Sequence, residues 1–324
     1  MRSATSSSRT AGEVPGRGPV VLVHGGAWDI PLEETEAHKE GLLRALRIGE
    51  RAVSRGLSAL DVAVEVVASL EDHPAFDAGR GAVLDRDGLP QLDAGVMEGE
   101  TRRWGAVANV RHIANPIRAA RELVYADGQA RLLVADGAER FAAEVSLPAV
   151  DPAHLVVPRE RERFDRLRTH ASFHTSQAFA GAMDVPRGTV GCVVLDGSGL
   201  LASATSTGGA PLTRSGRVGD SPIPGSGFMA TPAGAASATG WGEAILTCQL
   251  CADVLSRVDS QAPAQAAESS LQRMADIVRW AGASRATGGL IVVDAEGRAG
   301  WAFTTPRMAR GAWRPSQDPW VAVS

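Results

Sequence analysis

The sequence predicts an α+β fold in which two stacked β-sheets are covered by helices on both outer faces. Three observations support this. Helical periodicity dominates the N-terminal part, short strands paired across glycine turns follow, and two more helices precede a closing hairpin. Sheets bury both faces when they stack on each other and carry helices outside. With 324 residues, 44% of them hydrophobic, the chain can bury a substantial core in one large domain or two small ones.

The chain begins with a predicted tail and a short strand. Residues 1–18 carry arginines and small polar residues without the apolar stretch of a secretory signal, which predicts a disordered tail. The apolar run Val20 to Val23 predicts a buried strand that leaves through a tight turn at Gly25 and Gly26. His24 is expected to fix that exit rather than to act in catalysis.

Two helices are predicted next. The first covers about 33–54, where leucines recur at helical spacing and Gly56 follows as a C-terminal signal. The second starts at Ser58, whose hydroxyl can cap the free amides of the first turn with Asp61 at the reciprocal position. It is expected to stop near residues 72–74.

The middle of the chain has weaker patterns. Recurring glycines and aspartates over 76–99 predict short strands joined by hairpins. Apolar spacing predicts helices at 117–124, after Pro116, and at 138–144. Residues 158–187 are rich in arginine and lack a sustained apolar face, so we expect a loosely held linker.

The C-terminal part alternates strands and helices. Asp196 to Gly199 predicts the turn of the first hairpin. Two predicted helices separate the second strand pair from a closing hairpin, and no internal repeat is visible. The expected strands are 189–195 with 200–206, 227–231 with 235–239, and 290–293 with 300–303, and the expected helices are 243–258 and 264–280.

Composition argues against several function classes. A formal net charge of −4 provides no basic field for nucleic acid, and no stretch approaches the roughly 20 apolar residues of a membrane span. The seven histidines show no metal-ligand spacing, and no GxSxG motif of a serine hydrolase is present. Cys248 and Cys251 form a CxxC without a thioredoxin-like or zinc-site context, so reduced, mostly buried thiols are expected. These features favour a cytoplasmic protein without nucleic-acid or membrane partners.

A series of motifs resembles the plant-type asparaginase and isoaspartyl peptidase family, whose members are N-terminal nucleophile hydrolases related to glycosylasparaginase. The motifs appear in the family's order and span nearly the whole chain. They are VHGGAW, LEDHPAFDAGRGA, LDAGVMEG, GAVANVRHIANPI, GTVG, TSTGG, GRVGDSP and ATGWGE. Each short motif alone is weak, whereas the ordered set is specific.

Thr189 of GTVG is the expected nucleophile. A threonine hydroxyl needs a base, and an N-terminal threonine carries one in its own α-amine, whose pKa is about 7.7–8.0. That nitrogen is an amide in the unbroken chain, so activity requires cleavage between Gly188 and Thr189. Glycine at 188 permits a strained conformation there. The local sequence alone would also suit a β-branched residue that opens a strand.

The resemblance and the residue chemistry together imply a substrate site. By resemblance Thr207 orients the nucleophile. The stretch Arg217, Val218, Gly219 and Asp220 offers a guanidinium and a carboxylate, which match the carboxylate and ammonium of an amino-acid head group. The resemblance makes Thr239 and Gly240 an oxyanion hole, where a strand passes into a helix. Trp241 and Gly242 complete the expected substrate-binding residues.

The resemblance also implies an architecture. It indicates a four-layer αββα sandwich, split into an α subunit of residues 19–188 and a β subunit of residues 189–324, with two such heterodimers forming a dimer. No cofactor is expected for catalysis. A structural sodium ion is implied near Leu70, Glu71 and Phe76, held by backbone carbonyl oxygens. The implied reaction is hydrolysis of L-asparagine or of β-aspartyl dipeptides to L-aspartate.

Three departures from the family pattern stand near these residues. Asp77 replaces the asparagine of the usual FNAG motif and adds a carboxyl group near the site, and Arg187 and Trp241 replace other common residues. Two rival functions remain open: a glycosylasparaginase-type amidase acting on N4-glycosylated asparagine, and a non-catalytic relative that only binds an amino acid. Gly188 argues against the first, because that branch usually has aspartate there.

Overall fold

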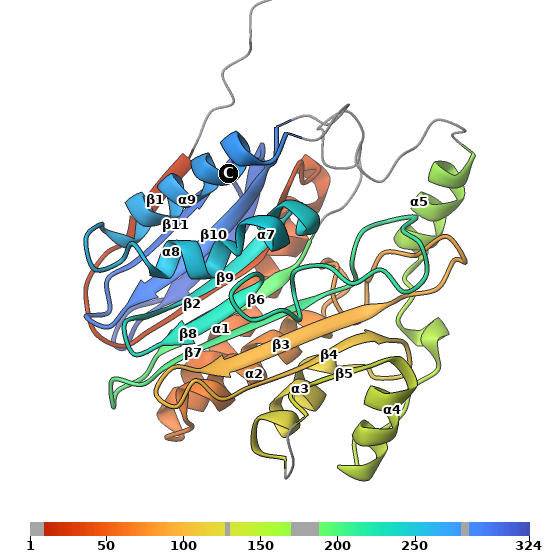
Figure 1. Ribbon diagram of the computed structural model, residues 1–324, viewed down its shortest axis with the longest axis horizontal. Helices are drawn as coiled ribbons and strands as arrows, with labels where there is room; N and C mark the ends of the chain where they lie inside the picture. The colour runs from red at the N-terminus through yellow and green to blue at the C-terminus, as the bar shows by residue number, and fades with distance from the viewer. Residues whose placement is uncertain (1–9, 127–129, 170–187, 280–284) are drawn as a thin grey trace, which may run out of the picture.

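The computed structural model describes residues 10–126, 130–169, 188–279 and 285–324. Two β-sheets pack face to face, and helices cover their outer faces (Figure 1). The predicted α+β class with two sheets flanked by helices is therefore confirmed.

The two sheets are almost entirely antiparallel, and β4 and β5 form a parallel pair. The smaller sheet has, in order, β1 (Thr10–Val14), β11 (Ala299–Phe303), β10 (Gly288–Asp294), β9 (Gly234–Gly240) and β8 (Phe228–Thr231). The larger sheet has, in order, β13 (Trp320–Ala322), β12 (Arg307–Trp313), β2 (Val20–Trp28), β6 (Val190–Leu195), β7 (Leu201–Thr207), β3 (Leu92–Glu98), β4 (Trp104–Val110) and β5 (Leu132–Val134).

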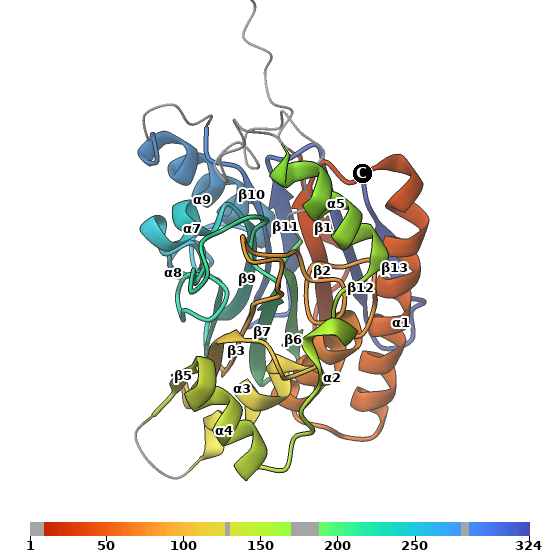
Figure 2. The same ribbon diagram turned by 90° about the vertical axis from the view of Figure 1, so that its right-hand side faces the viewer.

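Helices close the two outer faces. The smaller sheet is covered by α7 (Gly242–Cys248), α8 (Leu250–Leu255) and α9 (Pro263–Ile277). The larger sheet is covered by α1 (Thr35–Ser54), α2 (Ala59–Glu71), α3 (Pro116–Tyr125) and α4 (Ala135–Glu144). The short helices η1 (Leu32–Glu34) and η2 (Pro152–His154) and the helix α5 (Pro158–Arg168) lie in connections, with α5 at one end of the molecule (Figure 2).

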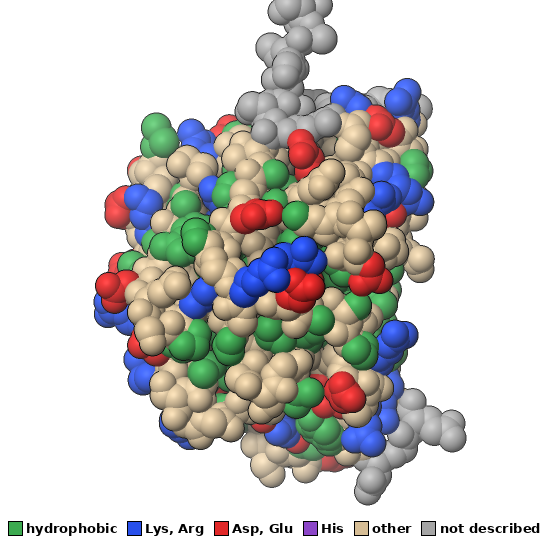
Figure 3. Space-filling view, turned by 90° about the vertical axis from the view of Figure 1, so that its left-hand side faces the viewer, with side chains coloured by type: hydrophobic (Ala, Val, Ile, Leu, Met, Phe, Trp, Pro, Cys, Tyr) green, Lys and Arg blue, Asp and Glu red, His purple; other side chains and the backbone are tan. Residues whose placement is uncertain are grey.

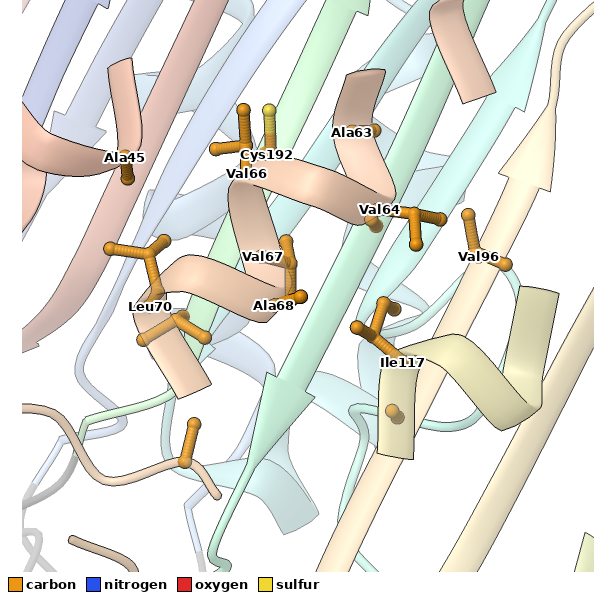
Figure 4. Close-up of a cluster of buried hydrophobic side chains, with 14 of the residues drawn as sticks. Ala45, Ala63, Val64, Val66, Val67, Ala68, Leu70, Val96, Ile117 and Cys192 are labelled. Atoms are coloured by element: carbon orange, nitrogen blue, oxygen red, sulfur yellow. The ribbon is translucent and has the colours of Figure 1, made fainter. Parts of the chain in front are cut away.

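Apolar side chains fill each interface between layers. Val66, Val67 and Leu70 of α2 lie under the larger sheet with Cys192 of β6 and Ile117 of α3 in one buried cluster (Figure 4). A separate cluster fills the space between the sheets. Because both faces of the central strands are buried, their sequences are apolar runs without polar alternation, as in β2 and β6.

Strands from before and after residue 188 alternate in the larger sheet. β2 lies between β12 and β6, and β7 pairs with both β6 and β3. In the smaller sheet, β1 pairs with β11. Breaking the chain at residue 188 would leave these ladders intact, and separating the two halves would destroy both sheets.

Several sequence predictions hold. The Ser58 side chain accepts a hydrogen bond from the Asp61 amide and caps α2, as its sequence predicts. The cysteines are buried and free, as expected. Four strands, β4, β5, β12 and β13, lie where the sequence patterns predicted no element.

The N-terminal predictions need two corrections. The tail expected at 1–18 is wrong for residues 10–14, because this segment pairs with β11 as an edge strand through its backbone. Residues 1–9 lie outside the described residues. The strand expected at 20–23 does not leave at Gly25 but continues to Trp28, with Gly26 at φ 103°.

Two other predictions fail for local reasons. Only β3 forms over 76–99, where turns and an isolated bridge between Leu84 and Pro90 replace the other expected strands. The helix expected at 243–258 breaks at Gln249, whose φ of 48° is left-handed and separates α7 from α8.

The linker expected at 158–187 is wrong for its first part, which forms α5. Glu160 and Arg163 are buried and paired with each other, and Arg163 also reaches Glu34 at 3.3 Å. Leu167 is only 1% exposed and joins the apolar cluster of the smaller sheet's helices. Charged residues therefore anchor this helix through pairing, which hydropathy alone does not reveal. Residues 170–187, including Arg187, lie outside the described residues.

We expect Leu167→Ala to test whether α5 is docked in solution. Removing this buried side chain should lower the free energy of unfolding by about 2–3 kcal/mol. Urea unfolding measures the loss, and Glu162→Ala on the exposed face of the same helix is the matched control. Equal stability of the two variants would show that α5 does not pack as described.

The surface carries both signs of charge. Figure 3 shows acidic and basic side chains interspersed over one face, with neither sign covering it. Within the described part of the chain, no helix is both long and apolar enough to span a membrane.

Candidate active site

Thr189 and Thr207 lie side by side at the ends of neighbouring strands. Thr189 immediately precedes β6, Thr207 ends β7, and the antiparallel pairing of these strands brings the two together. The Thr189 hydroxyl donates to the Thr207 hydroxyl oxygen at 3.2 Å, and both residues are buried. The Gly209 amide donates to the same Thr207 oxygen at 3.0 Å, which fixes its position. The sequence spacing of these threonines therefore corresponds to a direct contact.

Asp77 lies against the bond expected to break. Its carboxyl group accepts hydrogen bonds from the Val83 amide at 2.9 Å and from the Gly188 amide at 3.4 Å. Burial raises the pKa of Asp77 well above its usual value, so the uncharged form is favoured. A methyl group at Gly208 would overlap the Asp77 carboxyl, so glycine is needed there. The carboxyl group expected near the site is thus beside Gly188.

Arg217 and Asp220 converge on one point. A methyl group added at Gly242 would lie 2.7 Å from Nη2 of Arg217 and 2.9 Å from Oδ1 of Asp220. Asp220 is buried, and its Oδ2 has no hydrogen-bond partner among the described residues. Burial raises the pKa of Asp220 to about 7, and the positive charge of Arg217 partly offsets this. A buried carboxyl oxygen without a partner is suited to receive an ammonium group.

Two acidic residues that the sequence analysis missed surround the arginine. Glu243 accepts from Nε of Arg217 at 3.0 Å, and it follows directly on the expected binding stretch. Asp93, opposite Thr207 in the sheet register, accepts from the Gly219 amide at 3.4 Å. Burial raises the pKa of Asp93 to about 6. Both residues stand within quoted motifs, LDAGVMEG and ATGWGE, and that was the available signal.

Thr239 and Gly240 end β9 beside the same region. Thr239 is fully buried, and its hydroxyl has no hydrogen-bond partner among the described residues. Two residues earlier on β9, the Ser237 hydroxyl lies 2.6 Å from the hydroxyl of Thr205 on β7. Side chains two residues apart share a face of a strand. Thr239 and Thr207 each lie two residues after this contacting pair on their own strands, so both side chains point into the space between the two sheets. Gly240 has a φ of 132°, which favours glycine.

Trp241, expected from the sequence among the substrate-binding residues, packs in the protein core. It is 4% exposed and lies in the cluster of α7, α8 and α9. Two residues further on, Glu243 holds Arg217. Gly242, at the start of α7, leaves space for Arg217 and Asp220.

The loop after α2 has converging backbone oxygens. A methyl group at Gly81 would approach the carbonyl oxygens of Phe76 and Pro74 at 2.6 and 2.8 Å. Carbonyl oxygens are ligands that suit hard cations. The Leu70 and Glu71 oxygens already accept amide hydrogen bonds, from His73 at 3.1 Å and Arg80 at 2.8 Å. Among the described residues, no group of histidine, cysteine, aspartate or glutamate side chains could hold a metal ion.

Comparison with known proteins agrees with these motifs. The model of a family described as "Asparaginase" matches residues 17–323. The chain is 39% identical over 302 residues to the zebrafish (Danio rerio) "Isoaspartyl peptidase/L-asparaginase", covering 93% of each protein. It is 36% identical to the Escherichia coli "Isoaspartyl peptidase" over 92% of this chain and 94% of that one. It is 37% identical to the Pyrococcus furiosus "Plant-type L-asparaginase", over 89% and 94%. The chain therefore belongs to the asparaginase family that includes the isoaspartyl peptidases.

Proposed function

We propose that this chain is a self-cleaving amidohydrolase that hydrolyses L-asparagine and β-aspartyl dipeptides to L-aspartate. The observation that carries the proposal is the contact between Thr189 and Thr207 directly after Gly188. The activities named for its relatives support the substrate class. In fold terms we assign it to the αββα N-terminal nucleophile hydrolases.

Self-cleavage begins when the Thr189 hydroxyl attacks the Gly188 carbonyl carbon. The Gly188–Thr189 C–N bond breaks as the nitrogen takes up a proton, which leaves an ester between Gly188 and the Thr189 oxygen. Water then hydrolyses that ester. The products are a Gly188 carboxylate and a free amine on Thr189, which is the base that the hydroxyl needs.

In the mature protein, the Thr189 amine takes the proton of its own hydroxyl, and the oxygen attacks the side-chain amide carbon of the substrate. Thr239 and Gly240 donate to the developing oxyanion. The amine returns the proton to the departing nitrogen, which releases ammonia or the amine of a peptide. Water hydrolyses the acyl-enzyme by the same route and frees aspartate.

The receptor for the substrate head group is the pair Arg217 and Asp220. We assign the α-carboxylate of the substrate to Arg217 and its α-ammonium to Asp220. The proximity of Arg217 to Gly209, whose amide bonds Thr207, supports a head group bound next to the nucleophile. Val218 and Gly219 form the loop between the two charged residues.

We also assign residues 19–188 and 189–324 to α and β subunits, and two such heterodimers to the working assembly. The alternation of their strands supports subunits that stay together after cleavage. A sodium ion bound by carbonyl oxygens of the loop around Phe76 would stiffen that loop. We assign it no catalytic step.

The pH dependence of substrate binding tests the receptor. The pKa of Asp220 is raised to about 7, so the carboxylate is lost as the pH falls through that value. The substrate's ammonium group needs the ionised Asp220 carboxylate, so KM should rise about tenfold for each pH unit below roughly pH 6.5. The pH dependence of kcat should instead follow the protonation of the Thr189 amine. Steady-state assays on asparagine measure both. Asp220→Asn should bind weakly without this trend in KM, and a flat KM in the unmodified protein would contradict the assignment.

A substrate panel separates the rival functions. Asparagine, a β-aspartyl dipeptide and a glycosylated asparagine should be compared at equal concentrations with the cleaved protein. Release of aspartate from the first two supports the proposal. Activity confined to the glycosylated substrate would favour a glycosylasparaginase, and binding without turnover would favour an amino-acid-binding relative.

A further inference from the structure

A hydrogen-bonded network of buried side chains lies directly beneath the two threonines. His24 of β2 contacts the backbone carbonyl oxygen of Thr189 through Nδ1 at 3.0 Å and the Ser237 hydroxyl through Nε2 at 2.8 Å. The Ser237 hydroxyl lies 2.6 Å from that of Thr205. His24, Thr205 and Ser237 are each fully buried, so the network lies within the space between the two sheets.

The sheet leaves Thr189 outside its regular ladder. The pairing of β2 with β6 ends at His24 opposite Gly191, two residues after Thr189. Once the bond to Gly188 is broken, Thr189 is a chain end that lies beyond the last paired residue. The Thr207 contact holds its side chain, whereas the His24 ring holds its carbonyl group. Fixing the carbonyl orients the Cα atom and hence both the amine and the hydroxyl.

The ring has a defined protonation pattern. A carbonyl oxygen only accepts hydrogen bonds, so Nδ1 of His24 must carry a hydrogen. In a neutral ring Nε2 is then an acceptor, and the Ser237 hydroxyl can donate to it. Burial lowers the pKa of His24 to about 3, which keeps the ring neutral at ordinary pH. The Thr189 carbonyl group therefore selects the Nδ1–H tautomer, and the Ser237 hydroxyl can complete it by donating to Nε2.

The sequence provides the space that this network needs. A methyl group at Gly191 would overlap both the Ser237 hydroxyl and Nε2 of His24. Gly191 is the second glycine of the GTVG motif, two residues after the nucleophile on the same face of the strand. Gly191 of β6 is thus required for the His24 ring to pass from β2 to Ser237 of β9.

We infer that His24 is a positioning residue for Thr189, holding the nucleophile's carbonyl group through Nδ1–H while the Ser237 hydroxyl holds the other ring nitrogen. This rests on the proposed function of Thr189. It assigns His24 a role in both self-cleavage and turnover, and it replaces the expectation that His24 only fixes the exit of its strand.

Three variants test the inference by turnover. His24→Leu removes both ring contacts, and His24→Asn places an amide N–H near the position of Nδ1. Ser237→Ala removes the Nε2 contact, together with the contact to Thr205, and leaves the Nδ1 contact to Thr189 in place. We expect His24→Leu to lower kcat by about 30-fold or more with KM within about threefold, since small misplacements of reacting groups are costly. His24→Asn should recover most of kcat, and Ser237→Ala should lose less than about tenfold. Self-cleavage rates should follow the same order. Thermal unfolding of the three variants, measured alongside, separates a loss of kcat from a loss of folded protein.

Equal losses of kcat in His24→Leu and His24→Asn, or full kcat in His24→Leu, would overturn the inference. A second measurement is independent of activity. Deuterium exchange of the segment after Gly188, compared in Thr189→Ala backgrounds, should be faster with His24→Leu and unchanged with His24→Asn. Lack of any turnover in the unmodified protein would contradict the proposed function, while unchanged exchange with His24→Leu would contradict the positioning role.

Discussion

Replacing Thr189 by alanine is expected to leave the chain in one piece and to abolish asparagine hydrolysis. Alanine has no hydroxyl to attack Gly188 or the substrate, so the loss of kcat should be at least about 10³-fold, as for other nucleophiles. Gel electrophoresis after prolonged incubation shows whether the chain divides, and ammonia release measures turnover. The fold should survive, because the strand ladders begin at Val190.

Two matched variants sharpen this prediction. Thr189→Ser keeps a hydroxyl and an amine on one residue, so it should still cleave itself and retain measurable turnover. Thr207→Val removes the hydroxyl that contacts Thr189 while keeping a β-branched shape. It should lower the rate of both reactions without changing where the chain is cut. Turnover by Thr189→Ala at the unmodified protein's rate would refute the mechanism.

Arg217→Gln is expected to give the largest loss of substrate affinity. It removes the only positive charge that we assign to the substrate's α-carboxylate, and it leaves the Glu243 and Asp93 carboxyl groups without their cation. The cost should be about 3 kcal/mol, or roughly 100-fold in kcat/KM, most of it in KM. Steady-state kinetics on asparagine and on a β-aspartyl dipeptide measure it.

Arg214→Gln is the control for that variant. Arg214 lies on the same loop, three residues earlier, with an exposed side chain. Its replacement changes the net charge by the same amount and should leave KM unchanged within about twofold. If both variants raise KM equally, the effect is a general one of charge on the loop, and Arg217 is not the receptor.

Much of the fold was accessible from the sequence. Periodicity located α1, α2, α9 and the hairpin of β6 and β7, because these elements have a continuous buried face or a glycine turn. Ser58 was recognised as a cap because its partner is only three residues away. Such local signals need no knowledge of the tertiary structure.

Elements stabilised by distant partners were not accessible. β1 is held by backbone pairing with β11, almost 300 residues later in the chain. α5 is anchored by Glu160 and Arg163, which hydropathy assigns to the surface. The two pair with each other, and Arg163 also pairs with Glu34. The helix breaks at Gln249 because this residue adopts a left-handed conformation, which a sequence normally signals with a glycine.

The candidate site likewise contains residues that the sequence predicts and residues that only the folded structure reveals. Thr189, Arg217 and Asp220 could be proposed because the chemistry of an N-terminal nucleophile and of an amino-acid receptor requires those groups. Asp93 and Glu243 surround Arg217 only after folding. His24 was assigned a structural role because its partners, Thr189 and Ser237, are more than 160 residues away in the chain.

The central claim is that scission before Thr189 frees the amine that activates its hydroxyl, and denaturing mass spectrometry of the active protein tests it most directly. We predict two polypeptides divided between Gly188 and Thr189, the second comprising the 324 − 188 = 136 residues that begin with Thr189. Turnover should appear in step with the divided form as it accumulates. A protein that hydrolyses asparagine at full rate while its mass remains that of the intact chain would contradict the account.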